Sequence, residues 1–464
     1  MSLLAVPVLL LLGGLAAWLG EGGRARRAHG IALAVLALAG IVLALAPAQA
    51  DLPWIPRFGI SLHLYLDGLS LALVVLTLSL GAVATLGSWN EIDRGAGLFQ
   101  LCHLWTLAGT VTVFLAADLF LFFFAWELMI VPMYFLIRHW GHEDRVRAAF
   151  KFFLFTQIGG LFLWLAILAL AFLHLRQFGR FSFDYFELRR LNLDFHTGLW
   201  LLLGFSLGFL VKLPTVPLHP WLPDAHTQAP TGGSVVLAGV LLKTGGYGML
   251  RFVPGLFPAQ AEAAAPWLLG LGAVAVLYGA HQAFAQRDLK RLVAYSSISH
   301  MGLVLVGGFS GTAAGYRGAV LTMLAHGLSA AALFSVAGML QQRRHSRDLA
   351  RFGGLWASAP RLGALTLAFA LAALGLPGLG NFVGEFLALL GAFPGHPGLT
   401  AVAALGLILA PLYALKLVQD CFHGPPGEAV ADAGGRETLV LGLLLTALLW
   451  LGLQPVLETL GAGP

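Results

Sequence analysis

Four ionisable residues lie inside long apolar segments of this sequence, namely Glu127, Lys212, Lys243 and Glu385. They stand out because the chain is 58% hydrophobic and only 11% charged. A charge at the centre of a bilayer costs roughly 3 kcal/mol on insertion scales, so it is retained mainly where it lines a pathway or meets a partner. The four residues therefore indicate a buried route along which carboxyl and amine groups take up and release protons.

Glu127 and Lys212 form the first predicted element of this route. Glu127 has apolar neighbours on both sides in LFLFFFAWELMIVPMYF, and Lys212 comes just before Pro214. Burial disfavours the charged form of each group, and a nearby opposite charge favours it. The sequence predicts a pair in which the distance to the carboxylate sets the proton affinity of the amine. The alternative is a fixed structural ion pair, although buried pairs are poor stabilisers.

Two histidines extend the route beyond Lys243, which two glycines follow in LLKTGGYG. His300 and His326 lie near the middle of apolar segments, and histidine relays protons between waters near physiological pH. The alternative for each is a core histidine whose nitrogens are satisfied locally. The predicted polar line runs from Lys212 through Lys243, His300 and His326 to Glu385.

The elements that must position these residues are membrane-spanning helices. The 464 residues have a mean hydropathy of +0.84, and an apolar run of about 17 to 25 residues crosses a bilayer as a helix. Open sheets do not survive in the hydrocarbon region, so the predicted class is all-α and polytopic, with residues 1–464 forming one membrane domain. The approximate predicted spans are 2–20, 30–48, 62–88, 98–116, 118–138, 149–173, 197–218, 232–253, 266–285, 292–311, 316–340, 361–390, 399–423 and 437–455.

Helix breakers interrupt the seventh and twelfth of these fourteen spans. The sequence around the seventh is VKLPTVPLHPWLPDAH, and the sequence around the twelfth is ALGLPGLGNFVGEF. Proline removes a backbone donor and clashes with the preceding turn, so both helices must open there. Matching broken helices in two halves of a membrane protein are typical of an inverted repeat with a transport path. An ordinary proline kink is the alternative at either site alone.

Charge and cysteine usage narrow the class further. The connections after odd-numbered spans hold most of the 27 Lys and Arg residues, which predicts that these connections are cytoplasmic and that both termini face outward. No basic tract interleaved with aromatic residues suggests nucleic acid as a partner. Cys102 and Cys421 are the only cysteines, so thiolate ligation of an iron–sulfur cluster or structural zinc is excluded. His139 and His142 are interpreted as part of a solvated turn rather than as metal ligands.

Long strings around these residues resemble the antiporter-like subunits of respiratory complex I, and subunit M of proton-translocating NADH-quinone oxidoreductase in particular. The strings are WELMIVPMYFLI, KLPTVPLHPWLPDAHTQAPTGGSV, LLKTGGYG, KRLVAYSSISHMG, AHGLSAAALF and GLGNFVGEF. Related subunits usually carry Lys at the position of Glu385, so the glutamate favours subunit M. The end of the chain soon after the last span also favours it over the largest antiporter-like subunit.

The resemblance implies two inverted five-helix repeats, at about 98–253 and 266–423, with the first three spans and the last one flanking them. It implies proton handling by Glu127, Lys212, Lys243, His300, His326 and Glu385. It also implies a multi-pass protein of the inner (cytoplasmic) membrane, with the other complex I subunits, especially neighbouring antiporter-like subunits, as partners. NADH, FMN, iron–sulfur clusters and quinone would be used on other subunits, and no cofactor or metal is expected on this chain. The alternatives are a subunit of a multisubunit sodium/proton antiporter, a complex-I-related hydrogenase, or a passive scaffold.

Overall fold

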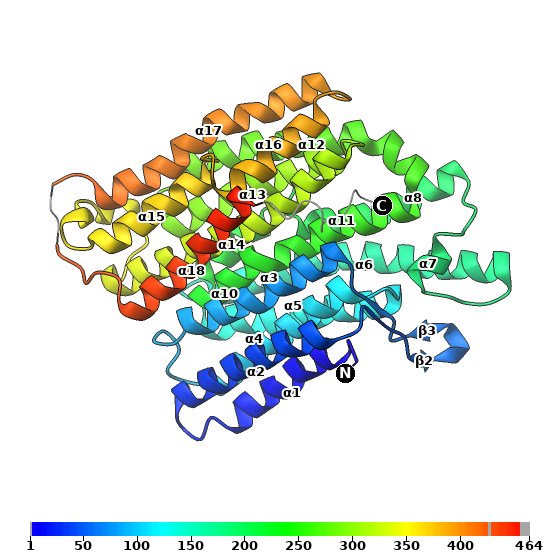
Figure 1. Ribbon diagram of the computed structural model, residues 1–464, viewed down its shortest axis with the longest axis horizontal. Helices are drawn as coiled ribbons and strands as arrows, with labels where there is room; N and C mark the ends of the chain where they lie inside the picture. Colours follow the sequence, from blue (N-terminus) through cyan, green and yellow to red (C-terminus); the bar gives the residue numbers. More distant parts are fainter. Residues whose placement is uncertain (1, 426–427, 455–464) are drawn as a thin grey trace.

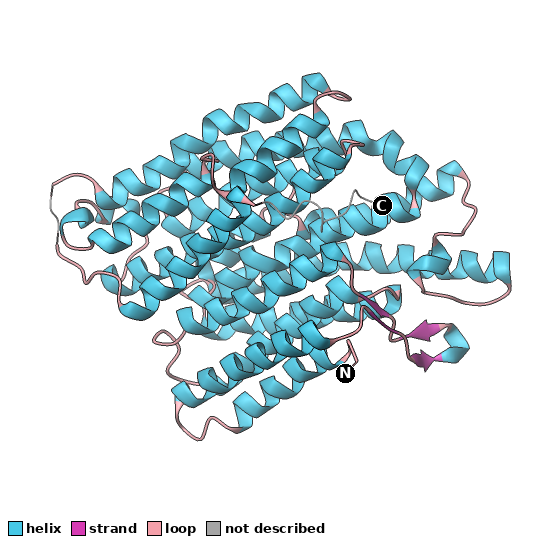
Figure 2. Cartoon of the chain, in the orientation of Figure 1, coloured by secondary structure: helices cyan, strands magenta, loops and turns pink. Residues whose placement is uncertain are grey.

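The computed structural model describes residues 2–425 and 428–454 and is almost entirely helical (Figures 1 and 2). The helices of the first half are α1 (Ala5–Leu19), α2 (Ala25–Leu45), α3 (Gly68–Gly87), α4 (Ala96–Leu115), α5 (Leu119–Trp140), α6 (Arg145–Phe178), α7 (Tyr185–Leu188), α8 (Phe195–Lys212), α9 (Trp221–Gln228), α10 (Thr231–Val236) and α11 (Leu242–Leu256). Those of the second half are α12 (Pro258–Ala285), α13 (Leu289–Gly308), α14 (Ala313–Arg344), α15 (Pro360–Ala373), α16 (Gly380–Ala392), α17 (Pro397–Phe422) and α18 (Gly435–Leu453).

The long helices run side by side in one bundle, and most connections gather at its two ends (Figure 1). Eleven helical segments of the described chain are long and apolar enough to cross a membrane, and three shorter apolar helices are α1, α15 and α16. The predicted all-α polytopic class is therefore confirmed, whereas the count of fourteen spans stays a prediction. Residue 455, the predicted end of the last span, lies outside the described residues.

Polar residues mark where several helices begin. The side chains of Asp67, Asp118, Asp194, Asp288 and Thr312 each accept a hydrogen bond from a backbone N–H in the first turn of the helix that follows. Such caps satisfy donors that have no partner within the helix. They fix the start of α3, α5, α8, α13 and α14, and therefore the height at which the last four helices carry their ionisable side chains.

Both predicted interruptions are present. α8 ends at Lys212 and α9 starts at Trp221, and α15 ends at Ala373 before α16 begins at Gly380. In the second break Gly375 and Gly378 have φ angles of 82° and 96°, which only glycine adopts without strain. A further irregularity was not predicted: residues Leu237–Leu241 form a π-helical turn between α10 and α11.

The predicted third span starts too early, because residues 64–65 belong to a short strand and the helix α3 begins only at Gly68. β1 (Gln49–Ala50) pairs with β4 (Leu64–Tyr65), and β2 (Pro53–Ile55) pairs with β3 (Ile60–Ser61). We call residues 46–67 the hairpin segment and the end of the bundle that carries it the hairpin face (Figure 1). The 179–194 connection packs there as well, through a bridge between Asp118 and Asp184. Within this connection the structure has one short helical turn, α7.

The opposite end of the bundle carries the 88–95, 141–144, 286–288 and 345–359 connections. Hydrogen bonds tie two of these segments to the junction of α9 and α10: the Thr231 N–H donates to Glu91, and the His142 N–H donates to the Gln228 carbonyl. A bridge joins Asp288 to Asp348. We call this end the vestibule face, because it contains the large polar cavity described below.

Candidate functional site

Glu127 and Lys212 lie on α5 and α8, at one side of the first half of the bundle. A carboxylate oxygen of Glu127 accepts a short hydrogen bond from the Gln157 side chain on α6. Lys212 is fully buried, and its Nζ atom has no hydrogen-bond partner within the described residues. It lies 5.6 Å from the Trp126 ring and 5.3 Å from the Phe152 ring, positions that suit a cation. The expected ion pair is therefore not a direct contact, and the two charges interact across a gap.

Lys243 lies directly after the π-helical turn, near the centre of the bundle. Its Nζ atom donates to the Ala238 carbonyl at 2.5 Å and is 2.7 Å from Nδ1 of His326 on α14. A π turn leaves a carbonyl out of the regular ladder, and such turns are frequent at functional sites. The irregular backbone thus supplies one of the two groups that hold the amine.

His300 on α13 connects this pair to the second broken span. Its ring centroid is 5.4 Å from that of His326, and its Nδ1 atom is 2.8 Å from Oε1 of Glu385 on α16. The Nε2 atom of His300 is 3.2 Å from the hydroxyl of Tyr413 on α17. The two histidines and Glu385 are nearly inaccessible to solvent. The helices α13, α14, α16 and α17 thereby bring these side chains together in the interior of the bundle.

The structure thus unites four of the six predicted site residues in a connected row, Lys243, His326, His300 and Glu385, which we call the central row. Glu127 and Lys212 stand apart from the row, in the first half. Side-chain polar atoms without a partner in the described residues include Nε2 of His326, Oγ1 of Thr322 and Oδ1 of Asn381. An unpaired buried polar atom costs about 1–3 kcal/mol, and buried water commonly pairs with such atoms. The row is therefore lined with groups suited to hydration.

Sequence reasoning missed Gln157, Tyr413 and His226. Gln157 is a lone amide among apolar residues in FTQIGG, which could have marked it. His226 follows the predicted break, and its two ring nitrogens have no partner in the described chain. Nothing in the sequence separates Tyr413 from an ordinary core aromatic. Within the described residues, no group of three or more His, Cys, Asp or Glu side chains could hold a metal ion.

The fold and the site define a class, a polytopic membrane protein with broken helices and a buried row of ionisable side chains. Residues 116–410 match the family described as "NADH:quinone oxidoreductase/Mrp antiporter, TM". The chain is 50% identical over 423 residues to NADH-quinone oxidoreductase subunit M of Escherichia coli K12. The aligned residues cover 89% of this chain and 83% of that protein. It is 48% identical over 484 residues to subunit M of Pseudomonas aeruginosa, covering 98% and 95% of the two chains.

A solved structure agrees with these relatives. A chain of respiratory complex I from Thermus thermophilus with bound NADH has a TM-score of 0.90 and 33% identity, with 99% of this chain and 97% of that chain covered. The chain therefore belongs to the NADH-quinone oxidoreductase subunit M family.

Proposed function

We propose that this chain is a proton-translocating membrane-arm subunit of NADH-quinone oxidoreductase. The contacts of the central row carry the proposal, since Lys243, His326, His300 and Glu385 are joined by hydrogen-bond distances or adjacent rings. Each of these groups accepts and releases a proton. The relatives named subunit M, at 48–50% identity, support the same conclusion.

The proposed mechanism begins with a change in the electric field at Glu127. Electron transfer from NADH to quinone, on other subunits that carry FMN and iron–sulfur clusters, alters the electrostatics at Glu127. Because Lys212 is fully buried and has no hydrogen-bond partner in the described chain, a change of charge at Glu127 shifts the balance between its protonated and neutral forms. A proton then moves along the central row from Lys243 to Glu385. A field shifts such an equilibrium only through its different interaction with the two protonation states.

The setting of the mechanism is the inner bacterial membrane, with other complex I subunits, above all neighbouring antiporter-like subunits, beside this chain. Basic residues are concentrated on the connections of the vestibule face, which supports a cytoplasmic position for it. The termini and the hairpin face would then lie outside. The two breaks, at 212–221 and 373–380, support inverted repeats over about 98–253 and 266–423.

The test is Lys212→Ala in the complete complex, reconstituted in vesicles. The substitution removes the group whose proton affinity responds to Glu127, so proton pumping driven by NADH oxidation should be lost or sharply reduced while assembly is preserved. Lys416→Ala is the matched control, because the Lys416 amine donates to the carbonyls of Phe284 and Gln286 away from the row. Full pumping by an assembled Lys212→Ala complex would contradict the proposal.

A sodium/proton antiporter subunit is the second candidate, because the matching family description also names Mrp antiporters. Glu385 favours the first candidate, since related antiporter-like subunits usually carry Lys there. Sodium-dependent proton exchange in vesicles without NADH would favour the antiporter. Unchanged transport after every substitution in the central row would instead indicate that the chain is a passive scaffold.

A further inference from the structure

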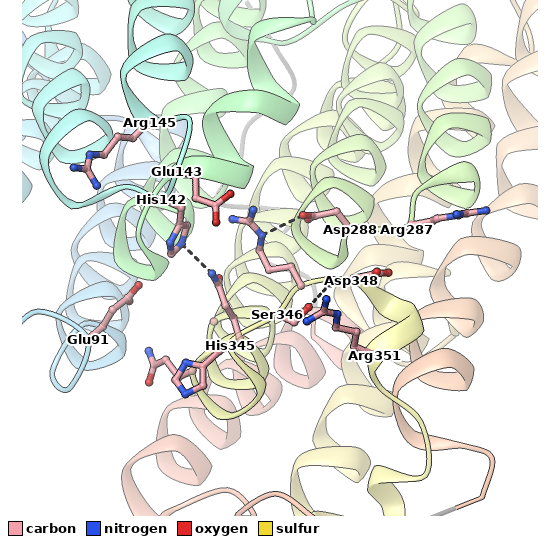
Figure 3. A pocket seen from close by; sticks show the side chains of 14 residues that line it. Glu91, His142, Glu143, Arg145, Arg287, Asp288, His345, Ser346, Asp348 and Arg351 are labelled. Carbon is pink, nitrogen blue, oxygen red and sulfur yellow. Dashed lines mark hydrogen bonds and ion pairs between the residues drawn. The ribbon is translucent and has the colours of Figure 1, made fainter. Parts of the chain in front are cut away.

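The two ends of the bundle are built differently. The vestibule face contains a polar cavity of about 910 Å³, on which charged side chains converge from connections that are far apart in sequence (Figure 3). His142, interpreted from the sequence as part of a solvated turn, is among the residues that line it. A polar space of this size holds water. At the hairpin face, the end of α11 is instead packed against aromatic and charged side chains.

One face of α11 leads from the central row to the hairpin face. Lys243, Tyr247 and Arg251 follow one another at intervals of four residues, and side chains with this spacing lie one above the other on a helix. Eight residues of helix span about 12 Å. Lys243 and Tyr247 are 0% and 2% exposed, and the Arg251 side chain is 15% exposed. A proton that left Lys243 along this face of α11 would therefore meet Tyr247 and then Arg251. We call these three residues the α11 stripe.

Arg251 is held in place by groups from three elements. Its Nη2 atom donates to Oδ2 of Asp67 at 2.6 Å and to the Ser70 hydroxyl at 3.3 Å, both at the start of α3. Its Cζ atom lies 5.4 Å from the centre of the Tyr247 ring. The hydroxyl of Tyr185 on α7 donates to the Arg251 carbonyl at 3.3 Å. The guanidinium therefore has a fixed position at the hairpin end of the α11 stripe.

The Arg251–Asp67 pair presents its positive group to the stripe. The guanidinium lies against Tyr247, whereas the carboxylate belongs to the cap of α3, where its other oxygen accepts the Ser70 N–H. Nε of Arg251 is buried and has no partner in the described residues. A guanidinium has only donors and stays protonated in proteins. Unlike the lysine, histidines and glutamate of the central row, Arg251 can neither accept a proton nor pass one on.

We propose that Arg251 is an electrostatic barrier that prevents protons from crossing between Lys243 and the hairpin face along α11. The inference rests on the proposed function and adds a residue that confines the proton to the central row. A fixed arginine charge excludes protons and other cations from narrow membrane paths. Pumping needs such a barrier, because a proton that returns through the protein dissipates the gradient that the complex has built. Glu385 then remains as the end of the row from which protons leave.

The test is Arg251→Gln in the complete complex, reconstituted in vesicles under an imposed pH gradient without NADH. At an effective dielectric constant of about 20, a unit charge about 5 Å from a path slows a crossing proton by on the order of 10²-fold. Asp67 offsets part of this effect. We therefore expect the passive proton flux, corrected for protein-free vesicles, to exceed that of the wild type by roughly tenfold or more. A flux equal to that of the wild type overturns the barrier.

Two controls separate the charge of Arg251 from its ion pair. Arg343→Gln breaks a pair with Glu437 that is also 2.6 Å long, and the Arg343 side chain is 14% exposed, but this pair lies at the vestibule end of α14. Asp67→Asn breaks the Arg251 pair itself, keeps a residue that caps α3 and leaves the guanidinium in place. Neither control should raise the proton flux. An equal rise with Arg251→Gln and with either control would show that loosened packing causes the leak, which overturns the barrier.

A double variant covers the case in which Arg251→Gln does not assemble. Removing one partner of a buried pair leaves an uncompensated charge, whereas Arg251→Gln combined with Asp67→Asn leaves none. The double variant also lacks the barrier charge, so it should show the raised flux, and a flux equal to that of the wild type overturns the barrier.

NADH-driven pumping by Lys212→Ala separates this inference from the proposed function. If Lys212→Ala abolishes pumping and Arg251→Gln does not raise the passive flux, only the barrier is wrong. If Lys212→Ala pumps fully, the proposed function itself is wrong.

Discussion

The Nζ atom of Lys243 lies 2.7 Å from Nδ1 of His326, in a position where neither group is exposed to solvent. An ammonium only donates, so Nδ1 must be unprotonated when Lys243 is charged, and one proton lies between the two nitrogens. The proton moves to His326 only if the amine can become neutral. Residue 243 must therefore be able to lose a proton if the contact is to pass one on.

Lys243→Arg tests whether residue 243 must lose a proton. Arginine preserves the positive charge at the centre of the bundle but stays protonated in proteins. We expect NADH-driven pumping to fall by on the order of 10²-fold at this subunit, with the complex assembled. Proton uptake into vesicles, normalised to NADH oxidation, is the measurement. Pumping at the normal ratio would show that Lys243 contributes only its charge.

Tyr413→Phe tests how His300 is oriented. The hydroxyl of Tyr413 contacts one ring nitrogen of His300 while Glu385 contacts the other, so the two partners fix the ring between them. A neutral hydrogen bond contributes about 1 kcal/mol, which corresponds to roughly a fivefold loss of pumping rate. Tyr134→Phe is the control, because the ring contacts of Tyr134 in the described chain are with Phe135 and Phe153, on α5 and α6. Equal pumping rates in both variants would show that the Tyr413 hydroxyl does not contribute to proton transfer.

These contacts also show what the sequence could and could not predict. A charge inside an apolar run is costly enough to mark a residue on its own, which is why Glu127, Lys212, Lys243 and Glu385 were found without a structure. The breaks were predictable because proline and glycine act locally. The all-α polytopic class followed from the long apolar runs, whereas the count of fourteen spans stays a prediction.

Contacts between helices were not predictable in the same way. The pairing of Glu127 with Gln157, rather than directly with Lys212, depends on how α5, α6 and α8 rotate against one another. The sequence of the π turn before Lys243 contains no proline or other residue that predicts it. The short strand of residues 64–65 lies in a segment apolar enough to be mistaken for the start of a span, because hydropathy does not report backbone geometry.

Gly384→Ala should displace Glu385 from His300. A Cβ atom at position 384 would lie 2.5 Å from the backbone nitrogen of Thr322 and 2.8 Å from its Oγ1 atom, so α16 would have to move away from α14. Overpacking of this kind costs about 1–3 kcal/mol. We expect a lower melting temperature and reduced pumping, measured on the purified complex.

Gly442→Ala is the control for this substitution, because a Cβ atom there meets nothing within 4 Å. It should change neither quantity, since the helix α18 has room at that position. Pumping at the normal rate by Gly384→Ala, despite a lower melting temperature, would indicate that the His300–Glu385 contact is not needed for transfer.

The attachment of the hairpin segment should depend on pH through His63. Its Nδ1 atom is 2.5 Å from Oδ2 of Asp184, and its Nε2 atom faces the Gln49 side chain. The hydrogen bond to Asp184 raises the pKa of His63 above its usual value, burial opposes this, and the charges of Asp184, Asp51 and Asp118 add to the increase. A group whose pKa is raised in the folded state stabilises that state at low pH.

The stabilisation should be fully present below about pH 6.5, the ordinary pKa of histidine, and should disappear as the pH rises through the raised value. Hydrogen exchange of residues 46–67 in the complete complex measures this, with His63→Gln compared at each pH so that the intrinsic exchange rate cancels. We expect wild-type protection to exceed that of His63→Gln at acidic pH and the difference to vanish at alkaline pH. A difference that increased with pH would mean that neutral His63 holds the hairpin segment, in which case the ion pair with Asp184 contributes nothing to its attachment.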